Sequence, residues 1–361
     1  MPEVLLFGAT GYTGRLVADA LFRRGADFAV AGRNRDELAR IASACGGVEV
    51  READAADVGS LVESLRGCRV LLTTVGPFSQ LGEAAVEAAL RAGVHYIDSC
   101  GEGLFVETLT DHYSERARRN GRVLAPAMGF DEVVAEVAAT IATEGLTPAN
   151  LILTYAAPTA ASPGTIRSIP GILAARAAFI EDGRVVEVAL AERRRWSPLP
   201  PPIGPKLALA APMAELQLAP RHLELASLET YLAMERRQAA LLTWAPPLLR
   251  RLERVRPLQR ALADAAIKLT PRPSRQSTTR SWAVMAEARC GQRWRNVTLR
   301  GSDVYGTTAE LLAAAAIALA SEPLGVAGML TPIEAFGTDF LHKQLINLDV
   351  SVDVYQEAGR H

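Results

Sequence analysis

The chain has 361 residues, of which 49% are hydrophobic and 22% are charged, and its formal net charge is -1. This composition excludes an intrinsically disordered protein, and the near-neutral balance gives no general attraction to nucleic acid or to a membrane surface. The four cysteines lack metal-ligand spacing, so we expect no metal site, and the expected compartment is the reducing cytoplasm. The length suits two domains or one large α/β unit.

No segment predicts a signal peptide or a transmembrane helix. The apolar run Val4–Phe7 is too short for a signal peptide, and Glu3 stands where such a peptide carries basic residues. The longest apolar stretch, Leu311–Ala320, has about half the length that a bilayer crossing needs. We therefore expect it to be a buried, alanine-rich helix.

Residues 1–130 alternate short apolar runs with segments of helical periodicity. This alternation, with short links, predicts a parallel sheet wound by right-handed crossovers, which is the doubly wound α/β architecture of a Rossmann-type domain. The expected strands are Val4–Phe7, Phe28–Ala31, Val48–Arg51, Val70–Thr73, His95–Ile97 and Arg122–Ala125. The expected helical segments are Arg15–Arg24, Arg35–Ala44, Asp57–Leu65, Leu81–Ala92 and Leu104–Asn120.

Residues 131–361 predict a second, α+β domain with a mixed sheet, which is the expected substrate domain. Asp131 can cap a helix that runs to about Thr143. Within about 196–270 we expect a proline-rich loop, Trp196–Pro212, followed by a helical insertion, Arg221–Lys268. The expected strands are Leu151–Ala156, Val185–Ala189, Trp282–Arg289 and Trp294–Gly301, and the last helix is Thr307–Ala320.

The first expected strand runs directly into a glycine-rich turn and then into a helix. Gly8 permits a tight turn, Gly11 lets the backbone approach a pyrophosphate, and Gly14 lets the helix pack close to the strand. The start of the helix offers N–H groups and a positive dipole to the phosphates. The polar side chains of the turn can add hydrogen bonds; they are Thr10, Tyr12 and Thr13.

Two further segments complete the expected cofactor site. An NAD enzyme usually carries an acid after the second strand, but here Arg33 and Asn34 follow it, and a guanidinium there can bind a 2′-phosphate in fork geometry. NADP(H) is therefore the expected cofactor, although Arg33 can also be a surface arginine at the start of the next helix. Asp54 is expected near the adenine. The turn after the fourth strand is expected beside the ribose and nicotinamide; it consists of Thr74, Val75, Gly76, Pro77 and Phe78.

Ionisable side chains follow the fifth and sixth strands, at the edge where doubly wound sheets bind ligands. Hydride transfer also needs an acid that protonates the developing anion, and Tyr96, Asp98, Glu102 and Asp131 are the candidates. The alternative for Asp98 and Glu102 is a structural role as caps of the helix after Gly103. We expect Cys100 to be a buried, inert thiol.

A basic stretch lies between Arg250 and Arg280, with only Glu253 and Asp264 as acids. It can be a solvated helix face, or a docking surface for an acidic carrier protein, a coenzyme A phosphate or an anionic membrane surface. The neighbouring apolar run Leu241–Trp244 suits either the entrance for an apolar substrate or ordinary core or dimer packing.

Several motifs resemble those of the saccharopine dehydrogenase-like oxidoreductases, a family that includes trans-acting enoyl reductases. The resemblance implies a Rossmann domain, a mixed-sheet substrate domain and NADP(H) in the cleft. Relatives often carry Ser-x-Pro-Ser-Asp where this chain has Glu132–Glu136, so substrate or mechanism can differ here. Besides the glycine-rich turn, the matching motifs are Ala31–Arg33, Thr74–Phe78, Tyr96–Glu102, Gly129–Asp131, Gly164–Thr165, Ser168, Tyr305–Ala309, Leu330–Pro332 and Ala335–Gly337.

The function that these observations predict is an NADP(H)-dependent reductase. The leading substrate is the C=C bond of a lipid, polyketide or other secondary metabolite, free or carried on an acyl carrier protein or coenzyme A. An imine reductase, or an opine- or saccharopine-type dehydrogenase acting on a C–N bond, is the second hypothesis. A regulator that binds NADP(H) without turnover is the third, because a fold does not decide a function.

Overall fold

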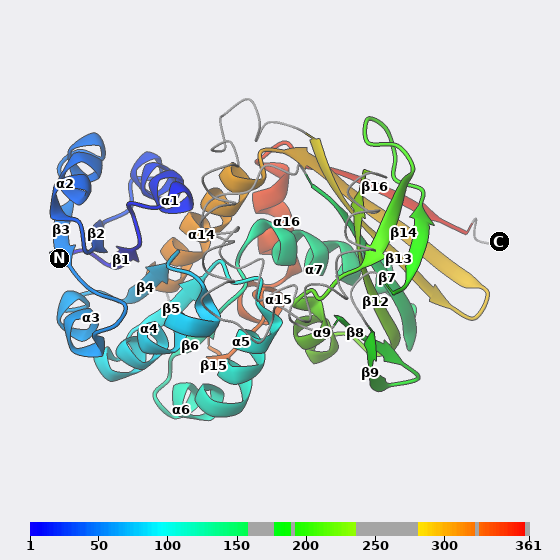
Figure 1. Cartoon of the computed structure of the whole chain (residues 1–361), viewed down its shortest axis with the longest axis horizontal. Coiled ribbons are helices and arrows are strands. Elements are labelled where there is room, and N and C mark those ends of the chain that lie inside the picture. The colour runs from blue at the N-terminus through cyan, green and yellow to red at the C-terminus, as the bar shows by residue number, and fades with distance from the viewer. Residues whose placement is uncertain (158–176, 189–191, 236–280, 322–324, 358–361) are drawn as a thin grey trace, which may run out of the picture. The chain divides into compact units, whose positions relative to one another are not determined.

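The computed structural model describes residues 1–157, 177–188, 192–235, 281–321 and 325–357. The chain forms two compact units (Figure 1). The first unit comprises Met1–Val133 and Tyr305–Gln344, and the second comprises Val134–Val304 and Leu345–His361. The division expected from the sequence assigns residues 305–344 to the substrate domain, whereas the structure groups them with the dinucleotide-binding domain.

A parallel seven-stranded sheet forms the core of the first unit, with the order β15-β6-β5-β4-β1-β2-β3. The residues of β1, β2 and β4 are all buried, as expected for apolar strands covered on both faces. The predicted Rossmann-type sheet is confirmed. Its strands are β1 (Val4–Phe7), β2 (Phe28–Gly32), β3 (Glu49–Glu52), β4 (Val70–Thr73), β5 (His95–Asp98), β6 (Val123–Ala125) and β15 (Gly328–Met329).

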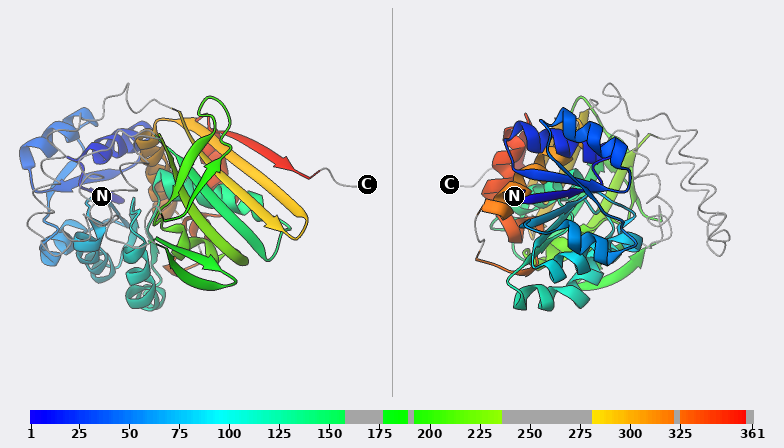
Figure 2. Two further views of the ribbon diagram at one scale, coloured as in Figure 1. Left: turned by 45° about the vertical axis from the view of Figure 1, so that its right-hand side comes forward. Right: turned by 90° about the vertical axis from the view of Figure 1, so that its left-hand side faces the viewer.

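Helices cover both faces of this sheet, with α1 and α2 on one side and α3 and α4 on the other (Figure 2). Local signals set their limits: Asn34 and Asp57 cap α2 and α3, and Gly93 ends α4 in the left-handed conformation at φ 68°. The helices are α1 (Tyr12–Arg23), α2 (Arg35–Ala44), α3 (Val58–Ser64), α4 (Phe78–Ala92), α5 (Gly103–Thr108) and α6 (Ser114–Arg119), with a π-helical turn at Leu109–Tyr113.

The chain returns to the first unit through α14 (Val304–Ser321), β15, α15 (Pro332–Phe336) and α16 (Thr338–Ile346). By length and composition α14 is the one helix among the described residues that could cross a membrane, but 61% of it is buried within the structure. Its middle, including Leu311 and Leu312, is buried, which confirms the predicted alanine-rich core helix. The strand β15 has two residues, too few to produce a sequence pattern, and this explains why the return to the sheet is not predicted.

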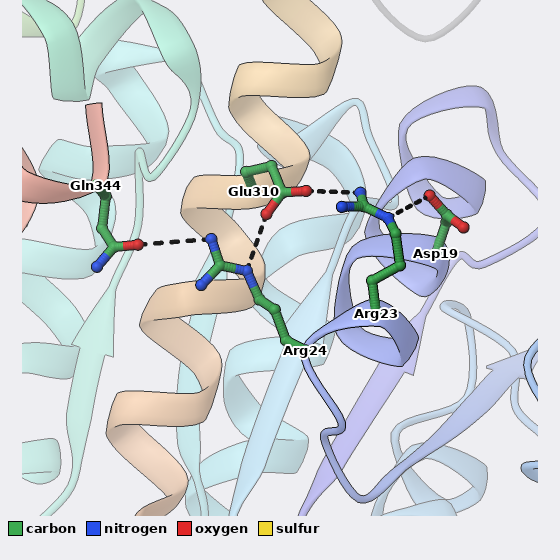
Figure 3. Close-up of polar contacts among 5 residues, drawn as sticks. All are labelled: Asp19, Arg23, Arg24, Glu310 and Gln344. Atoms are coloured by element: carbon green, nitrogen blue, oxygen red, sulfur yellow. Dashed lines mark hydrogen bonds and ion pairs between the residues drawn. The ribbon is translucent and has the colours of Figure 1, made fainter. Parts of the chain in front are cut away.

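An ion cluster attaches α14 to α1 (Figure 3). Glu310 accepts hydrogen bonds from Arg23 Nη2 at 2.6 Å and from Arg24 Nε at 2.8 Å. Asp19 holds Arg23 at 3.0 Å, and Gln344 lies 3.5 Å from Arg24. The Glu310 side chain is only 12% exposed, so its carboxylate has lost most of its contact with water. The two guanidinium groups offset the free-energy cost of this desolvation.

The second unit is built on a mixed sheet with the order β10-β11-β12-β7-β13-β14-β16, and the hairpin β8–β9 pairs with β12. The pair β12–β7 is parallel and the other pairs are antiparallel, which confirms the predicted mixed sheet. Its strands are β7 (Ala149–Ala156), β8 (Ala177–Glu181), β9 (Arg184–Val188), β10 (Arg194–Ser197), β11 (Lys206–Ala210), β12 (Leu225–Met234), β13 (Ser281–Cys290), β14 (Arg293–Ser302) and β16 (Ser351–Gln356), and its short helices are α9 (Glu215–Leu218) and the 3₁₀ turn Ala219–Arg221.

Three local expectations differ from this structure. The expected loop Trp196–Pro212 contains the end of β10 and all of β11, and the expected helical run from Arg221 begins with β12. Pairing of β12 with the distant strand β7 outweighs its local helical propensity. Asp131 lies inside the first turn of α7 (Phe130–Thr143) and not before it. Residues 236–280, with most of the expected helical insertion and the basic stretch, lie outside the described residues.

Candidate functional site: the carboxyl edge of the parallel sheet

The glycine-rich turn has the close contacts that its three glycines predict. Gly8 has φ 93°, and a Cβ there would lie 2.6 Å from Cγ2 of Val75. A Cβ on Gly14 would lie 2.2 Å from the carbonyl oxygen of Gly8, so only glycine lets α1 pack this close to β1. Gly11 is exposed, and a Cβ there would meet only that same oxygen, at 3.3 Å. The backbone at Gly11 is therefore open on the side from which a pyrophosphate would approach.

The beginning of α1 differs from those of the next three helices of the sheet. Its N-cap residue, Gly11, provides no side-chain hydrogen bond, and its first turn contains no acidic residue. By contrast, α2 and α3 begin with the side-chain caps Asn34 and Asp57, and a carboxylate of Glu102 binds the first N–H groups of α4. The positive end of α1 thus remains available to an anion, and the residues present fit the diphosphate of a dinucleotide.

Arg33 follows β2 and is exposed. Among the described residues it forms no ion pair, whereas the neighbouring Arg35 pairs with Glu52 at 2.9 Å. A guanidinium without an internal partner at this strand end fits a 2′-phosphate. Asn34 and Asp54 have local partners instead: Oδ1 of Asn34 accepts from N–H of Glu37 at 3.1 Å, and Oδ1 of Asp54 accepts from N–H of Ala56 at 3.0 Å. Cofactor contacts of these two residues stay predictions.

The segment after β4 lies against the glycine-rich turn. Thr74 donates a hydrogen bond from its Oγ1 to the carbonyl oxygen of Gly8 at 3.2 Å, and Val75 packs over Gly8. Phe78 is buried, and its ring packs on that of Phe105 with centroids 5.9 Å apart. Partly exposed residues of both segments line this edge of the sheet; they are Thr10, Tyr12, Thr13, Thr74, Val75, Gly76 and Pro77.

Tyr96 and Asp98, two residues apart on β5, form a buried pair. The Tyr96 hydroxyl donates to Oδ2 of Asp98 at 2.6 Å, while Oδ1 accepts from the N–H groups of Cys100 at 2.8 Å and Ala127 at 3.0 Å. Burial raises the pKa of Asp98 to about 6 and that of Tyr96 well above its ordinary value. Neither side chain has exposed surface. Through its two backbone hydrogen bonds, Asp98 joins the loop after β5 to the loop after β6. Cys100 is buried as expected, and burial raises its thiol pKa.

Glu102 stabilises the start of a helix, but not the helix expected. Its Oε1 accepts from N–H of Phe78 at 2.9 Å and its Oε2 from N–H of Ser79 at 3.0 Å. The following helix α5 receives no side-chain cap from it. The carboxylate thus joins the loop after β5 to the start of α4, a contact that sequence spacing does not reveal.

Two acids open α7 at this edge. Asp131 is partly exposed, and its position deep among protein atoms raises its pKa to about 6. The Glu132 carboxylate lies over two glycines: a Cβ on Gly101 would be 2.9 Å from Oε1, and a Cβ on Gly129 would be 3.0 Å from Oε2. Of the four acids predicted for proton transfer, Asp131 alone combines partial exposure with a raised pKa.

Further along α7, in the second unit, Glu136 is fully buried and its Oε1 lies 3.7 Å from Nδ1 of His222. Nothing in the local sequence predicts this pair, because 85 residues separate its members in the chain. Among the described residues, no group of three or more His, Cys, Asp or Glu side chains could hold a metal ion.

The comparisons with known proteins agree with this geometry. Residues 4–127 match the family described as the saccharopine dehydrogenase NADP binding domain. The chain is 35% identical over 147 residues to a lipid droplet localized protein of Caenorhabditis elegans, covering 37% of this chain and 34% of that protein. It is 32% identical over 178 residues to a trans-acting enoyl reductase of Mycobacterium ulcerans, covering 45% of this chain and 43% of that protein. The matched region thus spans less than half the length of either relative.

The fold is similar to that of a solved structure whose match covers nearly the whole chain. The apo form of a saccharopine dehydrogenase (L-Glu forming) from Saccharomyces cerevisiae superposes with a TM-score of 0.69, covering 99% of this chain and 100% of that chain. The two sequences are 14% identical. At this identity the likeness concerns the fold, and it supports the description of a Rossmann-type sheet followed by a second, mixed sheet.

Proposed function

We propose that this protein is an NADP(H)-dependent oxidoreductase that reduces a C=C bond. Its residues 4–127 match the saccharopine dehydrogenase NADP binding domain, which supports this cofactor. The observation that carries the proposal is the start of α1, which has no side-chain cap, together with the exposed Arg33, which forms no ion pair among the described residues. These two features bind two different anions, a diphosphate and a 2′-phosphate, whose combination is peculiar to NADP(H).

The choice of a C=C bond is supported by the relative named trans-acting enoyl reductase. We propose an acyl substrate of the lipid or polyketide type, bound to an acyl carrier protein or to coenzyme A. In such an α,β-unsaturated thioester the β-carbon accepts a hydride, and the α-carbon then takes a proton.

Bound NADPH would supply the hydride, and the residues of this chain would hold the reactants and deliver the proton. The N–H groups at the start of α1 would bind the diphosphate, and the segment Thr74–Phe78 would form the wall beside the nicotinamide. Asp131 is the proposed proton donor because it is partly exposed at this edge of the sheet and because burial raises its pKa to about 6, closer to neutral pH than that of an ordinary aspartate. Tyr96 and Asp98 are buried, and Glu102 is bound to α4, so these residues are proposed to support the site from behind.

The proposal is tested by following NADPH oxidation at 340 nm with a substrate panel. One half of the panel contains trans-2-enoyl thioesters of coenzyme A and of acyl carrier protein, and the other half contains imines formed from oxo acids and amines. Oxidation with the thioesters alone supports the enoyl reductase. Oxidation with the imines alone would replace it by a C–N reductase or dehydrogenase, and NADPH binding without oxidation by any compound would favour a regulator.

A further inference from the structure

One motif of the sequence has no role in the function described so far, namely Tyr305–Ala309 at the start of α14. These residues are distant in sequence from the glycine-rich turn, yet they belong to the same compact unit. Their position follows from three contacts, all of which lie within the first unit.

The first contact joins two aromatic rings. Tyr12 is the first residue of α1 and directly follows Gly11, the open glycine of the turn. The ring of Tyr305 meets the ring of Tyr12 edge to face, with centroids 5.0 Å apart and an interplanar angle of 84°. Both tyrosines are partly exposed, so the pair lies at the surface of the turn and not in the core.

The second and third contacts hold the start of α14 in this place. Oγ1 of Thr308 accepts a hydrogen bond from N–H of Phe130 at 3.0 Å, at the junction of β6 and α7. Glu310 binds Arg23 and Arg24 at the other end of α1 (Figure 3). The first two turns of α14 therefore contact both ends of α1 and the start of α7. These contacts leave the Tyr305 ring little freedom to move away from Tyr12.

We propose that Tyr305 is a cofactor-positioning residue: its ring fixes the ring of Tyr12 beside Gly11, and the two tyrosines together form one wall of the dinucleotide diphosphate site. Tyr12 is the first residue of α1 and directly follows Gly11, where the diphosphate would approach the helix. Tyr305 thus adds a residue from the second half of the chain to a site whose other proposed residues lie within the first 131. The proposal rests on NADP(H) binding at the glycine-rich turn and is independent of the substrate that is reduced.

The expected effect follows from the strength of such a contact. An edge-to-face aromatic pair contributes enough free energy to change a dissociation constant about 3- to 10-fold. Tyr305→Ala should therefore weaken NADPH binding about 3- to 10-fold, whereas Tyr305→Phe, which keeps the ring, should bind NADPH as the unaltered protein does. Because both substitutions break one contact, the losses in Tyr12→Ala and Tyr305→Ala should not add in the double variant.

The experiment is a fluorescence titration of the full chain with NADPH, accompanied by thermal unfolding of each variant. Phe340→Ala is the matched control, because it removes a ring contact of the same first unit that is made within α15 and α16 and not at the turn: Phe340 stacks on Phe336 with centroids 5.5 Å apart. This control should alter stability without altering NADPH affinity. Tyr305→Leu keeps apolar volume and serves if the alanine variant does not fold.

Two results would overturn the proposal. If the unaltered protein binds NADPH and the variants Tyr305→Ala and Tyr305→Leu bind it equally well, the tyrosine pair has only a structural role. Strictly additive losses for Tyr12 and Tyr305 would contradict the coupling between the two rings. Failure of the unaltered protein to bind NADPH would reject the proposed function together with this proposal. The titration of the unaltered protein distinguishes this outcome from a failure of the tyrosine proposal alone.

Discussion

At the scale of single residues, the chemistry of the site is set by which polar groups have internal partners. Asn34, Asp57 and Glu102 bind the first N–H groups of three helices, while the N-cap of α1 has no side-chain hydrogen bond and Arg33 forms no ion pair among the described residues. The role of Arg33 stays a prediction, whereas the close contacts of the glycine-rich turn could be predicted from the sequence because they depend on local geometry. The capping contact of Glu102 could not, since it depends on how two loops meet.

Cofactor choice depends on Arg33. Arg33→Ala should weaken NADPH binding by about 1.5–3 kcal/mol, the usual contribution of a hydrogen bond to a charged group, and change NADH binding little. Isothermal titration with both cofactors measures this. Arg35→Ala is the matched control, because Arg35 already pairs with Glu52 and should leave both affinities unchanged. An equal loss for NADPH and NADH in Arg33→Ala would refute the assignment.

Gly11 and Gly14 should respond differently to added side chains. Gly11→Val should abolish NADPH binding with little loss of stability, because its Cβ meets only the Gly8 oxygen, at 3.3 Å. Gly14→Ala should lower the free energy of unfolding by about 1–3 kcal/mol or more, because its Cβ would lie 2.2 Å from the same oxygen. Urea unfolding and NADPH titration of both variants separate the two effects. Normal NADPH binding by Gly11→Val would place the nucleotide elsewhere.

Proton transfer should depend on Asp131. Its raised pKa of about 6 means that the acid holds its proton below that pH and loses it above. The rate of the proton-transfer step should therefore fall as the pH rises through about 6, and Asp131→Asn should lower turnover about 10²–10⁴-fold at unchanged NADPH affinity. Single-turnover kinetics between about pH 5 and 8 would show both effects. Normal turnover of the variant would assign protonation to solvent or to another residue.

At the scale of elements, the structure depends on pairings between distant parts of the chain. All six predicted strands of the first sheet are present: β1, β2 and β4 are fully buried and have a strong apolar signal of their own, whereas β3 is exposed or partly exposed along its length. The seventh strand, β15, has only two residues and is stabilised by pairing with β6, so no local sequence pattern predicts it. The sequence likewise predicts a helix where the structure has β12, because the parallel pairing of β12 with β7 is not a local property of the sequence.

The attachment of α14 to α1 is the element-scale feature with the clearest energetic consequence. Glu310→Ala removes a carboxylate that is 12% exposed and that joins two arginines to α14, so the free energy of unfolding should fall by about 1–2 kcal/mol. Glu63→Ala breaks an exposed ion pair with Arg66 and should change it by less than about 0.5 kcal/mol. Urea unfolding compares the two, and equal effects would show that the ion cluster does not fasten α14.

At the scale of the whole molecule, the sequence predicts a Rossmann-type domain and a second, mixed-sheet domain, and the structure contains both. The proposed dinucleotide site lies within the first unit, to which Tyr305 also belongs and in which its ring meets that of Tyr12. The substrate could not be predicted, because it is chosen by side chains of several distant segments and not by the glycine-rich motif that identifies the cofactor.

In the proposed reaction, hydride passes from NADPH to the β-carbon of an unsaturated acyl thioester. The transfer of deuterium from labelled NADPH to the product measures this step directly. The protein is incubated in ordinary water with NADPH carrying deuterium at both C4 positions and with trans-2-enoyl thioesters, and the product is analysed by mass spectrometry and deuterium NMR. We expect one deuterium in the saturated product, at the β-carbon, and a proton from water at the α-carbon. A saturated product without deuterium at the β-carbon, or deuterium transferred only to the carbon of an added imine, would contradict it.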